Sequence, residues 1–155
     1  MSKSLRRVTA ALRDAGLDIA PVEMPDSTRT AAEAADAVDC HLDQIAKSII
    51  FGTADGCALF LTAGDNQVDA TRASDLAGQP LTRADAAIVR RVTGFAIGGV
   101  APIGHLTPSP IWMDPRLLDF ETVWAAAGTP RHVFPIAPEV LQRITGATVA
   151  AFTAP

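Results

Sequence analysis

Three glycines and a proline fall within one short stretch that could present its backbone to a ligand. The stretch runs from Gly98 to His105 and reads Gly-Gly-Val-Ala-Pro-Ile-Gly-His. Glycine tolerates a positive φ and lets the main chain approach a ligand closely, while proline stiffens a loop by fixing φ. The stretch is therefore suited to offering N–H and C=O groups to a small polar ligand. The same residues are also typical of a tight turn after a strand.

The second feature that could take part in binding or catalysis is a lysine in an apolar segment. The chain has two lysines, Lys3 near the start and Lys47 inside a run rich in strand-forming residues. In a strand, Lys47 would share a face with Ile45, Ile49 and Phe51. A buried ammonium needs a partner, and a bound phosphate or carboxylate would supply one. A lysine at the edge of a sheet, or one that reaches water, would not need a ligand.

Side chains for conventional catalysis are sparse. His41, His105 and His132 are scattered, and Cys40 and Cys57 lack the spacing of zinc ligands. We therefore predict no metal site and no cofactor. The chain contains neither a Gly-x-Ser-x-Gly elbow nor a Walker A motif. His105 is the candidate general base because it ends the glycine-rich stretch, and a structural histidine is the alternative.

The elements that must position these residues alternate irregularly. Thr30 and Glu33 form the pattern of a capping box, and the turn at 54–56 predicts a hairpin. One hairpin within an irregular alternation favours an α+β fold over a doubly wound sheet. We predict helices over 5–12, 30–38, 69–76, 82–91 and 139–144, and strands over 18–23, 45–51, 57–62, 95–97, 110–113, 122–125, 132–136 and 148–152.

Composition limits the class of protein. The chain has 155 residues, of which 48% are hydrophobic, and we expect one domain over 1–155. It contains neither a run of about eighteen apolar residues nor a secretory signal pattern, so we expect a cytoplasmic protein with reduced thiols. The net charge of −4 argues against a broad nucleic-acid interface. A nucleic-acid partner would touch only terminal nucleotides, or another protein would hold it.

The chain resembles the YbaK/EbsC family, which includes the editing domain of bacterial prolyl-tRNA synthetases and its free-standing relatives. The resemblance covers nearly the whole chain, and its unusual segments occur in the family's order. These segments are Thr30 to Glu33, Gln44 to Phe51, Thr93 to His105, Ala127 to Pro130 and Ile136 to Leu141.

The resemblance implies a mixed, partly closed sheet flanked by helices. It also implies a trans-editing deacylase that removes a wrongly attached small amino acid from tRNA, with errors of the tRNA-Pro type or related ones as substrates. The implied partners are the acceptor end of a mischarged tRNA and an aminoacyl-tRNA synthetase, with no cofactor and no contact with DNA or a membrane. The alternative function is a non-catalytic module that binds an aminoacyl or nucleotide ligand and regulates another protein.

The same resemblance assigns roles to individual residues. Lys47 would bind the terminal phosphate or ribose, and Gly98 and Pro102 would frame the loop that holds the ester. These three are the candidate catalytic residues. The candidate substrate-binding residues are Thr30, Ser48, Gly99, Val100, Ala101, Ile103, Gly104 and His105.

Overall fold

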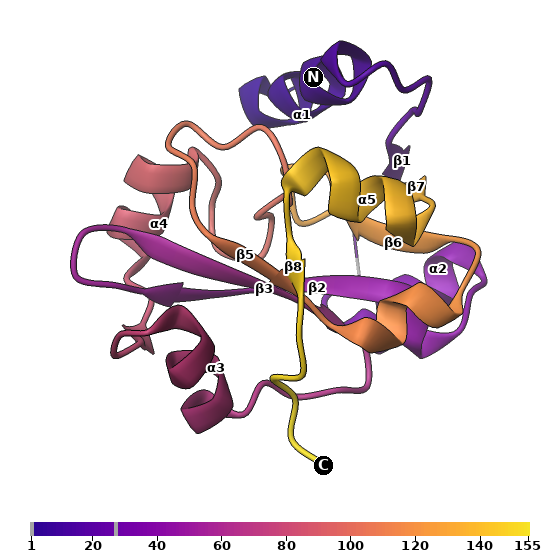
Figure 1. Ribbon diagram of the computed structural model, residues 1–155. Helices are drawn as coiled ribbons and strands as arrows, with labels where there is room; N and C mark the ends of the chain where they lie inside the picture. Colours follow the sequence, from indigo (N-terminus) through magenta and orange to yellow (C-terminus); the bar gives the residue numbers. More distant parts are fainter. Residues whose placement is uncertain (1, 27) are drawn as a thin grey trace.

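The computed structural model describes residues 2–26 and 28–155, and its centre is a mixed sheet of eight strands (Figure 1). The strands follow the order β1-β7-β6-β2-β3-β5-β8, and β4 pairs with β2 beside this path. Their bounds are β1 Val22–Glu23, β2 Ile45–Gly52, β3 Cys57–Ala63, β4 Thr82–Arg83, β5 Ile111–Met113, β6 Val123–Ala126, β7 His132–Ile136 and β8 Thr148–Val149.

Antiparallel and parallel pairings coexist in this sheet. The β2–β3 hairpin and the β6–β7 pair are antiparallel, whereas β2–β6, β3–β5 and β5–β8 are parallel. This mixture confirms the predicted α+β class. The helices are α1 Lys3–Asp14, α2 Ala31–Val38, α3 Ala70–Ala77, α4 Ala86–Thr93 and α5 Pro138–Thr145, with the short 3-10 turns η1 Leu42–Gln44 and η2 Pro115–Asp119.

Helix ends follow local sequence chemistry closely. The predicted capping box at Thr30 and Glu33 is present, and both of its reciprocal hydrogen bonds form. Asp69 and Asp85 cap α3 and α4 through their carboxylates. None of the helices in residues 2–26 and 28–155 has the length and apolar character needed to cross a membrane.

Two predicted elements are wrong. Residues 95–97 are not a strand, because the chain turns there and the Gly99 N–H donates to the Ala96 carbonyl at 3.0 Å. Thr82 does not cap a helix; it lies in β4 opposite Gly52, and Asp85 takes the capping role. A glycine turn determines the structure of residues 95–97, and pairing with the distant strand β2 determines that of Thr82.

Two other predicted strands are much shorter than expected. Only Val22–Glu23 of 18–23 and only Thr148–Val149 of 148–152 are paired. Each of these short strands has a single neighbour, β7 for β1 and β5 for β8. Position at the end of the sheet thus limits pairing that the apolar sequence alone would permit.

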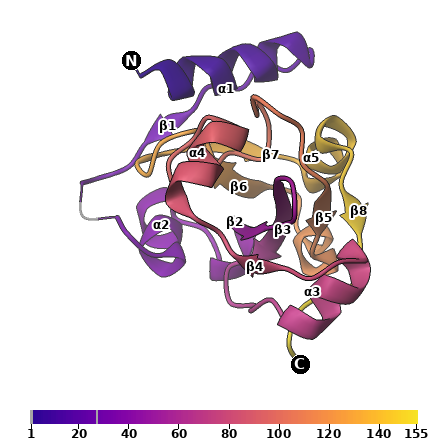
Figure 2. The same cartoon turned by 90° about the vertical axis from the view of Figure 1, so that its left-hand side faces the viewer.

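The two faces of the β2–β3 hairpin pack against different helices. Leu59 and Leu61 belong to the main core, which also contains apolar side chains of α1, α4 and α5. Phe60 faces the other way and packs with Ala73 of α3 and with Phe152. Figures 1 and 2 both show α1 and α3 on opposite sides of the hairpin.

The second edge of β2 is only partly occupied. Along one edge β2 pairs with β3 from Ala46 to Gly52. Along the other, β6 pairs with Ile45 and Ala46, and β4 pairs with Phe51 and Gly52. Within the described residues, no strand covers the stretch from Lys47 to Ile50 on that side. The sheet is therefore open at its centre, beside the candidate lysine.

Candidate functional site

A cavity of about 640 Å³ borders the open edge of β2 and contains Lys47; we call it the Lys47 cavity. A larger cavity of about 820 Å³ lies between α1 and the chain leading into β1, but it is lined by none of the predicted site residues. Of those residues, the Lys47 cavity brings together Thr30, Lys47, Ser48, Gly98 and Val100.

Lys47 reaches this cavity although β2 is an inner strand. Its neighbours Ile49 and Phe51 pack in the apolar cluster of α3, as the alternation predicted. The ammonium donates a hydrogen bond of 2.7 Å to the main-chain carbonyl of Asn66. Partial burial lowers the pKa of Lys47, while nearby carboxylates, first that of Asp65, act against this shift.

Ser48 offers polar groups to the same cavity from the opposite face of the strand. Its hydroxyl oxygen is buried and has no hydrogen-bond partner among the described residues. Ser48 lies opposite Leu61 in the antiparallel β2–β3 pair, and the carbonyl of Leu61 accepts a hydrogen bond from the Asp114 N–H on the β5 side. The main-chain groups of Leu61 therefore point away from β2. In an antiparallel pair the opposite residue then also points its groups outward, so those of Ser48 face the open edge of β2. A buried polar atom without a partner is costly, and a bound ligand would satisfy it.

A tight turn places the glycine-rich loop at the cavity. The hydrogen bond from Gly99 to Ala96 closes a four-residue turn with Gly98 in its third position. Gly98 has a φ of +94°, which is the conformation that a type II turn requires there and that favours glycine. The N–H of Gly99 is thus used inside the turn, and Gly98 and Val100 line the cavity on either side of it.

Gly99 has a different reason to be glycine. It is buried, and a Cβ at this position would lie 2.8 Å from the carbonyl carbon of Thr129. The loop therefore approaches the backbone of Thr129 and Pro130 more closely than any side chain would allow.

One wall of the cavity was missed by sequence reasoning. The hydroxyl of Thr129 and Nδ1 of His132 are 2.6 Å apart, and both residues line the cavity. Arg131 also lines it but is paired with Glu23 and Asp26, each at 2.6 Å. In the sequence, the signal for this wall is the family-like segment 127–130. From the sequence, His132 is considered only as a candidate metal ligand.

The second half of the glycine-rich loop lies elsewhere. Pro102, Ile103, Gly104 and His105 line a separate cavity of about 300 Å³ beside α1, which we call the Pro102 cavity. Ala101, between the two halves, is completely buried. The structure thus divides the predicted loop residues between two cavities.

His105 is held in a structural setting. Its Nε2 lies 2.6 Å from the carbonyl of Ala101, which can only accept, so Nε2 carries the proton. Its Nδ1 is buried and has no partner among the described residues. Burial lowers the pKa of His105, and the positive charge of Arg7 lowers it further. The hydrogen bond to the Ala101 carbonyl acts in the opposite direction but is outweighed. The neutral ring is favoured.

Within residues 2–26 and 28–155, no group of three or more histidine, cysteine, aspartate or glutamate side chains could hold a metal ion. Both cysteines are free thiols, and burial raises the pKa of Cys40 and of Cys57. The described side chains that line the Lys47 cavity therefore offer one ammonium, the guanidinium groups of Arg29 and Arg131, the carboxylate of Asp26, hydroxyl groups and the imidazole of His132, but no thiol.

Comparison with known proteins gives concordant matches. The family model for the aminoacyl-tRNA editing domain matches residues 25–144. The uncharacterized protein YwhH of Bacillus subtilis (strain 168) is 30% identical over 124 residues, which are 79% of each chain.

Two solved structures match the whole chain. A proposed trans-editing enzyme for prolyl tRNA synthetase is 47% identical with a TM-score of 0.95, covering 100% of this chain and 99% of its own. A structure from work on epitope grafting onto scaffold proteins is 46% identical with a TM-score of 0.95 and full coverage of both chains.

Proposed function

The chain belongs to the aminoacyl-tRNA editing domain family, and we propose that its Lys47 cavity hydrolyses the ester between tRNA and a wrongly attached small amino acid. The family and the close match to a trans-editing enzyme make the chain an aminoacyl-tRNA deacylase. The location of the reaction, the size of the amino acid and the part of the tRNA that is bound are our inferences.

One combination of features supports the Lys47 cavity as the place of the reaction. The Lys47 cavity combines a lone in-strand ammonium, an unpartnered buried hydroxyl and a glycine turn at an open strand edge. A partly buried ammonium and a buried hydroxyl without a partner are costly in a purely structural role, and the glycine turn lines the same cavity. A ligand with an anionic group and several polar atoms would satisfy the ammonium and the hydroxyl, and an aminoacylated nucleotide has both.

The contacts with tRNA are inferred to be few. Lys47 would bind the terminal phosphate or ribose, and exposed Arg29 stands at the same cavity. Arg131 is already neutralised by two carboxylates. With a net charge of −4, the chain would recognise mainly the acceptor end, because phosphate neutralisation dominates broad nucleic-acid binding.

The chemistry needs no side-chain nucleophile. An aminoacyl ester is already activated, so positioning and dipoles supply the remaining stabilisation. A water attacks the ester carbonyl, assisted by the neighbouring ribose hydroxyl, and the negative charge develops on the carbonyl oxygen. The amides of Gly98 and Val100 are the candidate donors to that oxygen, since the amide of Gly99 is committed to the turn. The bond between the carbonyl carbon and the ribose oxygen then breaks, and that oxygen takes the proton that the attacking water gives up, which leaves the free amino acid and the tRNA.

Size exclusion would set the specificity for a small amino acid. Met24, Val100 and Trp124 give the cavity apolar walls. An apolar pocket distinguishes substrates that differ by one methylene by only about 1–3 kcal/mol. Steric exclusion of larger side chains is therefore the expected basis of selection.

The test is a panel of tRNAs mischarged with alanine, cysteine, serine or threonine, assayed for loss of the ester. At least one should be deacylated, and the Lys47→Ala variant should lose that activity while Lys3→Ala, which removes the other lysine, keeps it. A folded protein that binds an aminoacyl ligand but releases none of the amino acids would instead identify a non-catalytic binding module.

A second measurement addresses the tRNA footprint. A minihelix of the acceptor stem should be deacylated nearly as well as whole tRNA. The slope of log K against log salt should be about −1 to −3, corresponding to one to three phosphate contacts. A minihelix that is barely processed would indicate a broad footprint or a synthetase that holds the tRNA.

A further inference from the structure

Lys47 is held through the segment that follows β3. Its contact with the Asn66 carbonyl, at 2.7 Å, uses one of the three N–H donors of the ammonium. Two donors remain for a ligand in the cavity. The direction of these two donors depends on where the Asn66 carbonyl lies.

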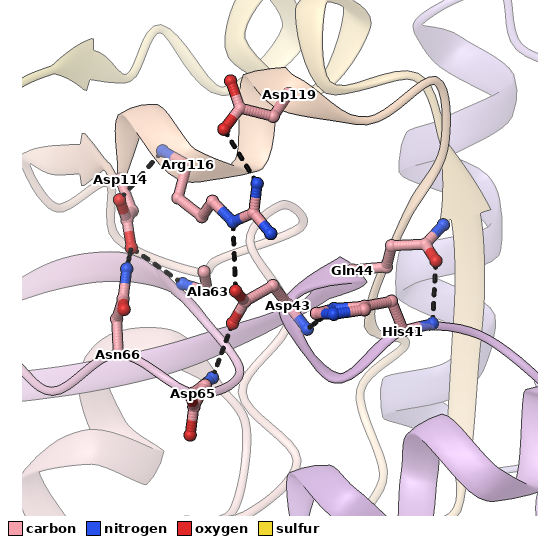
Figure 3. A network of polar contacts seen from close by, with 9 residues as sticks. All are labelled: His41, Asp43, Gln44, Ala63, Asp65, Asn66, Asp114, Arg116 and Asp119. Carbon is pink, nitrogen blue, oxygen red and sulfur yellow. Dashed lines mark hydrogen bonds and ion pairs between the residues drawn. The ribbon is translucent and has the colours of Figure 1, made fainter.

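Asn66 is anchored by a buried carboxylate. Its side-chain amide donates to Oδ2 of Asp114 at 2.9 Å, and the main-chain N–H of Ala63 donates to the same oxygen at 3.1 Å. Asp114 is 2% exposed and lies directly after β5. Figure 3 shows Asn66 and Ala63 converging on this carboxylate. A carboxyl group outside the lining of the cavity thus fixes the residue that holds Lys47.

A second carboxylate clamps the same segment from the other side. Oδ1 of Asp43, in η1, accepts the main-chain N–H of Asp65 at 2.9 Å. Its Oδ2 is 3.0 Å from Nε of Arg116. Burial acts to raise the pKa of Asp43, but the hydrogen bonds from Asp65 and Arg116 outweigh it and lower the pKa.

Arg116 links the two carboxylates. Its main-chain N–H donates to Oδ1 of Asp114 at 3.0 Å while its side chain pairs with Asp43 and with Asp119 (Figure 3). The segment 63–66 is therefore held by three hydrogen bonds that it donates, two accepted by Asp114 and one accepted by Asp43. Asp43 also pairs with the guanidinium of Arg116, and a hydrogen bond to a charge-paired carboxylate is among the stronger ones.

We propose that Asn66 and Asp114 are positioning residues that act through Lys47: Asp114 fixes Asn66, whose carbonyl orients the ammonium toward the substrate. This inference rests on the proposed function of the Lys47 cavity. It explains why charged residues of η1 and of the segment after β5, outside the lining of the cavity, are organised around the loop that Lys47 contacts.

A double-mutant cycle tests the coupling. Asn66→Ala keeps the main-chain carbonyl but removes its anchor, and it should lower kcat/KM about tenfold, as expected for the loss of one hydrogen bond. In a Lys47→Ala background the same change should have no further effect, because residues that act through one group are not additive. Gln67→Ala, at the exposed neighbouring position, is the matched control and should leave kcat/KM unchanged.

Lysine NMR supplies a readout independent of turnover. The chain has only Lys3 and Lys47, so isotope-labelled lysine gives two side-chain signals, which Lys3→Ala assigns. Asn66→Ala should move the Lys47 signal and leave that of Lys3 in place. An unmoved Lys47 signal, or rate losses that multiply in the cycle, would refute the positioning role. If Lys47→Ala itself keeps full activity, the proposed function of the cavity fails instead, and the NMR result still tells whether Asn66 holds the lysine.

Discussion

The two halves of the glycine-rich loop are adjacent in sequence but serve different parts of the molecule. Gly98 and Val100 line the Lys47 cavity, whereas Pro102 and His105 line the smaller Pro102 cavity beside α1. The first half is a turn with Ile97, 51% exposed, at its tip. A motif that the sequence presents as one ligand-binding unit is therefore divided in the structure between the candidate site and a second cavity beside α1.

The anchoring of the second half has a clear physical basis. Arg7 of α1 donates to the carbonyl of Gly104 at 2.7 Å, and its guanidinium lies 4.5 Å from the centre of the Phe95 ring. Ala101 is completely buried between the halves. The second half thus ties the loop to α1 and keeps the first half at the open edge of β2.

The largest expected effect sharpens the functional side of this comparison. Lys47→Ala should lower deacylation at least tenfold, because a lost charge-assisted contact with a phosphate or ribose is worth about 1.5–3 kcal/mol. The fold should persist, since the ammonium is only partly buried and its removal leaves the apolar neighbours of β2 in place. Single-turnover rates on the best mischarged tRNA, together with melting curves, measure both quantities. A well-folded Lys47→Ala protein with normal turnover would remove Lys47 from the site.

A matched pair of glycine substitutions tests the division directly. Gly98 and Gly104 both have positive φ, +94° and +76°, and an added Cβ has no close contact at either position. Alanine should therefore cost about 1–2 kcal/mol of backbone strain at each. Gly98→Ala should reduce turnover about five- to thirtyfold if that strain displaces the turn. Gly104→Ala should reduce only the free energy of unfolding. Equal effects of the two variants on turnover would show that the loop works as one unit after all.

Sequence reasoning predicted what local chemistry decides. Capping residues such as Thr30 and terminal glycines such as Gly146 located the helices, and the apolar alternation around Lys47 located β2. The family-like segments then led to the correct fold class and family.

The missed features depend on contacts between distant segments. The open edge of β2 exists because β6 and β4 each pair with only two of its residues, and no local pattern encodes where those pairings stop. The wall formed by Thr129 and His132 joins the cavity only because β7 lies next to β6. The apolar run 95–97 predicted a strand, but the turn at Gly98 prevailed.

The smallest expected effect concerns His105, on the anchoring side. Its folded-state pKa lies below the ordinary value because the ring is buried. As the pH falls below about 6.5, the unfolded chain binds a proton at this histidine that the folded chain resists, so stability decreases. The physical reason is that burial disfavours the charged ring, and a proton on Nδ1 would be a buried donor without a partner among the described residues.

His105→Gln removes this titration while keeping a side-chain donor for the Ala101 carbonyl. Between pH 7 and pH 5, the free energy of unfolding of the native sequence should fall more steeply than that of the variant, by up to about 1.4 kcal/mol per pH unit for one proton. Chemical denaturation at several pH values measures the two slopes, and deacylation at pH 7 should be nearly the same for both proteins. If turnover instead collapses while the slopes coincide, His105 is the general base that its place at the end of the loop suggested. The Pro102 cavity would then belong to the reaction, and the division of the loop into a functional and an anchoring half would be wrong.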